Sequence, residues 1–243
     1  MAAMTGQFKY VFDFSGRETV NFTVFLDGLS RYVPAKPAVP PEWSRLSSHQ
    51  CVPCTLTAEQ HPFCPVACNI AQLVTAFKYT ISHAQCVVSC SSIERTVTKK
   101  TTVQEGLASI LGLLMATSGC PILDFFRPMA RFHLPFSTVE ESIFRVVAMY
   151  MLRQYYKQNK RQEDPLNEIR THYAKVQQVN AGLLDRIRHI SALDADKNAI
   201  ITLNSLSQIL EMEIDANLES LQYLFITEDR RQSTEDRAET KEI

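Results

Sequence analysis

The sequence predicts an α+β protein in which a small antiparallel sheet, made of two hairpins, packs against a bundle of helices, with a helical C-terminal half. Two patterns predict this class. Apolar and polar residues alternate in two pairs of short segments, which is typical of hairpin strands with one buried face. In the second half of the chain apolar residues instead recur every three or four positions, which indicates amphipathic helices.

The first hairpin is expected over residues 8–26. Its alternating apolar residues are Tyr10, Phe12, Phe14, Val20, Phe22, Val24 and Leu26, on either side of a turn at residues 15–17. Four prolines follow between residues 34 and 41, and they exclude both a helix and a central strand. This stretch is therefore expected to be an extended surface connection.

The next elements are a helix and a second hairpin. Apolar residues at helical spacing predict a helix that starts close to Cys68 and includes residues 70–77. Alternation then predicts two strands over residues 86–90 and 95–99, joined near Ser91 and Ser92. Cys86 and Cys90 fall on one face of the first of these strands, so we expect them to be core residues.

Two capping-box patterns predict the starts of helices. Thr102 and Glu105 indicate a helix over residues 103–117, which Gly119 and Pro121 end. Its apolar part, residues 107–116, is about half the length that a membrane span needs and is expected to be a buried helix. Ser137 and Glu140 indicate another helix, with an apolar face over residues 143–151.

The polar run at residues 157–164, which ends at Pro165, is the best candidate for a domain boundary. We therefore predict an α+β domain over residues 1–160, a helical region over 165–227 and a charged, disordered tail over 228–243. Apolar spacing places helices within this second region at about residues 169–187 and 203–210.

Composition narrows the classes of partner. Hydrophobic residues make up 45% of the chain and its formal net charge is -1, so no charge field draws it to nucleic acid. We expect no secretory signal and no membrane span, hence a cytoplasmic protein. Whether the protein has a protein partner, and its oligomeric state, stay open.

In a reducing compartment, seven cysteines favour metal ligation or redox chemistry over disulfides.

A cysteine-rich segment over residues 49–68 carries the most specific chemical signal. Two thiolates separated by two residues can turn toward one ion, as in zinc and iron-sulfur sites. The best three ligands are Cys51, Cys54 and Cys64. The candidates for a fourth ligand are Cys68, His61, His49 and the distant Cys120. We favour Cys120, because it lies between Gly119 and Pro121 at a helix end where the chain must turn.

Four thiolates suit either Zn(II) or a [4Fe-4S] cluster, and their spacing does not distinguish the two.

A second candidate site is a pocket near Arg127, Arg131 and His133, in an apolar stretch bounded by prolines. We favour the simpler interpretation of this stretch, a surface loop whose arginines cap helix ends, because no nucleophile or carboxylate pattern accompanies it. No phosphate loop, serine-nucleophile elbow or zinc-protease motif is present.

Several of these segments together resemble an uncharacterised bacterial family, a domain of unknown function. The similarity is carried by His49 to Cys54, by the His-Pro-Phe-Cys-Pro run at 61–65, by Ser-Gly-Cys-Pro at 118–121 and by residues 130–136. It covers roughly residues 8–156. The resemblance implies that the family carries Cys51, Cys54, Cys64 and Cys120, together with His49 and His61, while the position of Cys68 can be apolar. It implies no activity.

Three functions are therefore expected in this order. The first is a non-catalytic metal or cluster module that stabilises the fold or senses redox state. The second is a metal- or cluster-dependent enzyme with the pocket near His133. The third is a protein-interaction adaptor that binds no metal.

Overall fold

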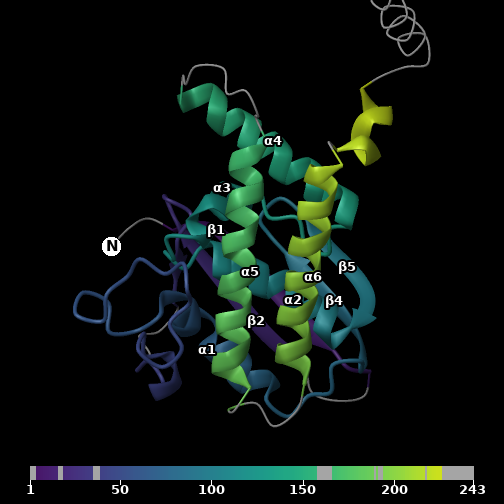
Figure 1. Cartoon of the computed structure of the whole chain (residues 1–243). Helices are drawn as coiled ribbons and strands as arrows, with labels where there is room; N and C mark the ends of the chain where they lie inside the picture. The colour runs from purple at the N-terminus through teal and green to yellow at the C-terminus, as the bar shows by residue number, and fades with distance from the viewer. Residues whose placement is uncertain are drawn as a thin grey trace, which may run out of the picture.

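We describe a computed structural model of the chain (Figure 1) over residues 4–15, 19–34, 39–157, 166–188, 190, 194–216 and 218–225. Residues 158–165 of the predicted boundary and the whole of the predicted tail lie outside this part of the chain. The predicted division into domains therefore stays a prediction.

The sheet consists of the two predicted hairpins, joined through their first strands, and a short additional strand that the alternation does not predict. Its five antiparallel strands have the order β3-β2-β1-β4-β5. In register, Tyr10 lies opposite both Phe22 and Cys90. The bounds of the strands are β1 Met4–Asp13, β2 Val20–Asp27, β3 Tyr32–Val33, β4 Gln85–Ser91 and β5 Thr96–Thr102. The predicted α+β class is confirmed.

One face of the sheet is buried, because the alternating apolar residues all point to the same side. This face includes Phe8, Tyr10, Phe12, Phe22, Val24, Leu26, Cys86, Val88 and Cys90, all of them buried. Cys86 and Cys90 are thus core residues, as the alternation predicts.

The helices form layers on this face (Figure 1), with α5 and α6 side by side in front of α2 and the sheet behind. Their bounds are α1 Pro65–Phe77, α2 Val103–Ala116, α3 Arg127–Arg131, α4 Val139–Lys157, α5 Asn167–Ile187 and α6 Ala195–Asp215, with short 3-10 helices η1 Glu42–Ser44, η2 Leu123–Phe126 and η3 Glu219–Leu224. Helix α2 is buried on nearly every side, since it lies between two layers. Within the described residues no helix is long and apolar enough to cross a membrane.

The predicted capping boxes need correction. Thr102 makes no capping bond at the start of α2, and Glu105 instead accepts a hydrogen bond from the Thr101 hydroxyl. The carbonyls of Ala84 and Ser82 satisfy the first amides of α2, because the chain before β4 runs beside this helix end. At α4 the reciprocal box exists one residue later than predicted, between Thr138 and Glu141.

Helices α5 and α6 share the core of the N-terminal half. The cluster that contains the buried face of the sheet and α2 also contains Val176, Val179, Leu183 and Ile187 of α5. A second cluster joins α4 to the opposite ends of α5 and α6 around Tyr150 and Tyr173. Helix α5 therefore packs against both parts of the molecule.

Two glycines of α2 offer a matched test of this packing. A Cβ atom at Gly106 would lie 2.6 Å from the Phe12 ring and 2.9 Å from Val88, whereas at Gly112 it would meet only Leu203, at 3.8 Å. We expect Gly106→Ala to lower the free energy of unfolding by about 1–3 kcal/mol through overpacking. Gly112→Ala should raise it by about 0.5–1 kcal/mol, because alanine favours the helix. Urea denaturation measures both, and equal effects would contradict the close approach of α2 to the sheet.

Candidate functional site

Four cysteines from three separate segments line one small cavity. They are Cys51, Cys54, Cys64 and Cys120, and the volume of the cavity is about 20 Å³. The rest of its wall is apolar apart from one arginine, and includes Leu46, Leu56, Val66, Ile122, Val179, Leu183 and Arg186. Such a space holds about one water-sized atom.

Local backbone structure brings the first three thiols to this cavity. The Cys54 amide donates to the Cys51 carbonyl (3.0 Å), which closes a turn through Val52 and Pro53. Cys64 precedes the first residue of α1, where Pro65 has the φ that a helix start needs. The Cys64 amide donates to the Ser44 carbonyl at 2.7 Å, so the start of α1 is held against η1.

Cys120 reaches the same cavity from the end of α2. The chain turns there through Gly119, whose φ of +82° belongs to the left-handed region that glycine adopts readily. Burial raises the pKa of the Cys120 thiol, while hydrogen bonds from the backbone of Leu123 and Ile122 oppose this rise. Amides that point at a sulfur stabilise its thiolate.

The alternative fourth ligands lie elsewhere. His49 and His61 are exposed. Cys68 is one turn into α1, half-buried, and its sulfur lies 3.8 Å from the Ser44 hydroxyl oxygen rather than on the cavity wall. Of the candidates for a fourth ligand, only Cys120 shares the cavity with the other three cysteines.

The thiols influence one another electrically. The pKa of Cys51 is raised to about 11, chiefly by burial and to a smaller extent by the neighbouring Cys64, Cys120 and Cys54, while Arg186 opposes the rise. Cys51 is therefore a neutral thiol at physiological pH unless a cation lies between the sulfurs. With the side chains as they stand, no three His, Cys, Asp or Glu residues in the described ranges are arranged to hold an ion.

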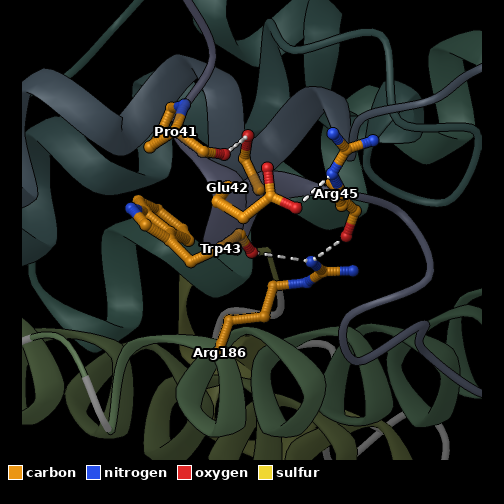
Figure 2. Close-up of polar contacts among 6 residues, drawn as sticks. Pro41, Glu42, Trp43, Arg45 and Arg186 are labelled. Carbon is orange, nitrogen blue, oxygen red and sulfur yellow. Dashed lines mark hydrogen bonds and ion pairs between the residues drawn. The ribbon is translucent and has the colours of Figure 1, made fainter.

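Arg186 brings a buried positive charge to the cavity. Its side chain comes from α5 and donates to the carbonyls of Trp43 (3.1 Å), Arg45 (2.6 Å) and Leu46 (3.1 Å). Figure 2 shows two of these bonds, which run from α5 to the η1 segment. The residue is 3% exposed. Its Nε atom is buried without a hydrogen-bond partner, and no carboxylate of the described residues forms an ion pair with it.

Burying such a cation in an apolar wall costs free energy unless a nearby negative charge compensates it. The guanidinium therefore favours negative charge on the cysteine sulfurs beside it.

Gly182, one turn before Arg186, lets the cysteine loop approach α5. A Cβ atom at this position would lie 2.8 Å from the Cys51 sulfur. In α5 the residues Val179, Leu183 and Ile187 are buried, and Arg186 falls on the same face. An arginine in that phase of the helix is a sequence signal for a buried cation, which our sequence analysis missed.

The second predicted site is divided by the structure. His133 lines a separate cavity of about 520 Å³, and the arginine on the wall of that cavity is Arg145. Arg127 instead forms an ion pair with Asp124 (3.1 Å), and Arg131 is exposed. The His133 Nε2 atom lies 2.5 Å from the Tyr10 hydroxyl oxygen. His133 is thus anchored to the sheet, and neither Arg127 nor Arg131 lines its cavity.

Comparison with known proteins identifies the family. Residues 8–226 match the model of DUF6901, a domain of unknown function, so the chain belongs to this family. The resemblance to a family of unknown function is thereby confirmed. No curated protein and no solved structure matches the chain.

His133, which is partly buried, gives the fold a pH dependence. Burial, and then the positive charge of Arg145, lowers the pKa of His133 from 6.5 to about 3. Between these two pH values the unfolded chain binds a proton that the folded chain does not, so stability falls as pH falls from 6.5 toward 3. We expect His133→Gln to weaken this dependence in urea denaturation at pH 7 and pH 5. Any metal held by the cysteines is common to the unmodified protein and the variant, so the difference between their pH dependences reports on His133 alone. Identical changes in stability between pH 7 and pH 5 would contradict a lowered pKa for His133.

Proposed function

We propose that this member of DUF6901 binds a metal ion through Cys51, Cys54, Cys64 and Cys120, and that the ion stabilises the fold. The observation that carries the proposal is the meeting of these four thiols, from three segments, in one cavity beside a buried guanidinium. An ion there would tie the loop after the sheet hairpin, the start of α1 and the end of α2 to one another.

The charges around the cavity suit this role. Four thiolates around a divalent cation leave net negative charge, which a buried site tolerates only beside compensating positive charge. Arg186 supplies such a charge from α5. The start of α1 adds the partial positive charge of a helix N-terminus beside Cys64. The negatively charged metal–thiolate group and the arginine would thus each lower the cost of burying the other.

The size of the cavity favours Zn(II) over an iron-sulfur cluster. A volume of about 20 Å³ is the size of a single ion, toward which the thiols would have to move from their present positions. A [4Fe-4S] cluster adds eight atoms between the same sulfurs and needs a much wider separation of the cysteine loop from Cys120. We therefore propose zinc, with a structural rather than a redox role.

Anaerobic purification, elemental analysis and a visible spectrum of the same sample test this proposal. The proposal predicts colourless protein with about one zinc per chain. A brown protein with stoichiometric iron and sulfide would replace zinc by a cluster and a structural role by redox chemistry. Protein that is folded and free of both metals would reject the proposal and favour the interaction adaptor.

Two cysteine variants separate metal ligation from simple packing. Cys120→Ser should lose the metal, and with it the roughly 4 kcal/mol of stability that binding contributes at about 1,000 times the dissociation constant. Cys68→Ser is the matched control, since Cys68 is a nearby half-buried thiol that does not line the cavity. It should keep the metal. Thermal unfolding with and without a chelator measures both, and metal loss in Cys68→Ser with retention in Cys120→Ser would reverse our choice of ligand.

A further inference from the structure

The larger cavity, whose wall includes His133, lies against a strip of α5 next to the one that faces the cysteines. Its volume is about 520 Å³, and it is bounded by α2, by the α3–α4 region and by α5 and α6. On α5, Val176 lines this cavity, whereas Val179 lines the cysteine cavity. A volume of this size is in the range of sites that hold small organic molecules.

The wall of this cavity is mainly apolar. Its apolar residues come from each of the surrounding elements and include Leu113, Met115, Phe126, Val176, Leu203 and Leu206. Free energy is gained when an apolar molecule replaces the water against such a wall. The main part of a ligand that fills the cavity is therefore apolar.

Arg145 of α4 gives this wall an excess of positive charge. Lys99 and Glu105, both exposed, contribute charges of opposite sign, and the pKa of His133 of about 3 leaves that residue neutral at pH 7. The remaining charge is that of Arg145, which is half-buried. Burial lowers the pKa of Arg145, because it removes part of the water that stabilises the guanidinium. An anion in the cavity would compensate for that lost water.

The guanidinium of Arg145 has hydrogen-bond donors that the protein does not use. Its Nη2 group donates to the carbonyls of Phe132 (2.9 Å) and Met129 (3.2 Å), which fixes its position on the wall. Among the described residues, its Nε and Nη1 atoms have no hydrogen-bond partner, and no carboxylate forms an ion pair with it. Neither nitrogen is buried, so a ligand can reach both of them.

Glu141, one turn before Arg145 on α4, does not take the place of such a ligand. Its negative charge raises the pKa of Arg145, but less than burial lowers it. Its carboxylate accepts a hydrogen bond from the Thr138 amide (2.7 Å) and does not line the cavity. The guanidinium therefore still favours a negative charge inside the cavity.

We propose that this cavity binds an amphipathic monocarboxylate, whose carboxylate accepts hydrogen bonds from Arg145 and whose apolar body lies against the wall. The apolar wall supplies affinity, and the single excess positive charge selects a single negative charge. The inference is independent of the metal site, because it rests on a different cavity and on none of its residues.

Three probes of similar shape and different charge test this chemistry on the protein as purified. They are 4-pentylbenzoate, the uncharged 4-pentylbenzamide and the positively charged 4-pentylbenzylammonium. Isothermal titration calorimetry at pH 7 should give saturable binding of the benzoate, about tenfold or more tighter than binding of the benzamide, with the ammonium weakest. Absence of benzoate binding, equal affinity for benzoate and benzamide, or tighter binding of the ammonium would each overturn the proposal.

Two cation variants then locate the carboxylate. Arg145→Met keeps an apolar side chain and removes the charge, so it should reduce the affinity for the benzoate to that for the benzamide. Lys99→Met is the matched control, since it removes an exposed positive charge from the same wall. It should keep most of the preference for the benzoate, because an exposed charge attracts an anion weakly. Loss of the preference in Lys99→Met with retention in Arg145→Met would overturn the assignment to Arg145.

Two variants of one glycine locate the apolar body and leave the bonds of Arg145 to Phe132 and Met129 in place. Gly112→Leu should fill the cavity from α2 and weaken benzoate binding at least about tenfold. Gly112→Ala should keep the affinity, since a Cβ atom there would meet only Leu203, at 3.8 Å. These variants test the site even if Arg145→Met does not fold. Full benzoate affinity in Gly112→Leu would place the binding elsewhere and overturn the proposal.

Discussion

The hydrogen bonds of Arg186 hold the two halves of the molecule together at the cysteine segment. One guanidinium on α5 donates to three carbonyls, those of Trp43, Arg45 and Leu46, in the chain around η1 that leads to Cys51. Because the bonds are largely buried, they are strong, and breaking one would leave an unpaired polar group that destabilises the fold. The position of the cysteine loop relative to α5 follows from this anchor, and Gly182 permits the close contact that results.

Helix α5 consequently contributes to the walls of two cavities that differ in chemistry. One strip of the helix faces sulfur atoms and the buried Arg186, and the adjacent strip faces a larger, mainly apolar cavity. Neighbouring residues, Val179 and Asn180, belong to different walls because successive helix positions differ by about 100° in direction. A displacement of α5 that opened one space would therefore change the other.

Local patterns in the sequence predict the sheet and most helices correctly. Alternation marks both hairpins, and helical spacing marks α2, because these features depend on near neighbours in the chain. The capping boxes were less predictable, since the carbonyls of Ala84 and Ser82, rather than Thr102, satisfy the start of α2. Spacing alone left four candidates for the last ligand, and the structure brings Cys120 alone among them to the cavity of the other three cysteines. The apolar cavity and the bonds of Arg186 depend on the packing of α5 and α6 against distant segments, which no local pattern encodes.

Zinc K-edge X-ray absorption of the purified protein tests the central claim most directly, because it reports the atoms bound to the metal. A site built from Cys51, Cys54, Cys64 and Cys120 predicts a single shell of about four sulfur atoms near 2.3 Å from zinc. A shell of nitrogen or oxygen atoms in the unmodified protein would contradict the claim that these four thiols bind the metal.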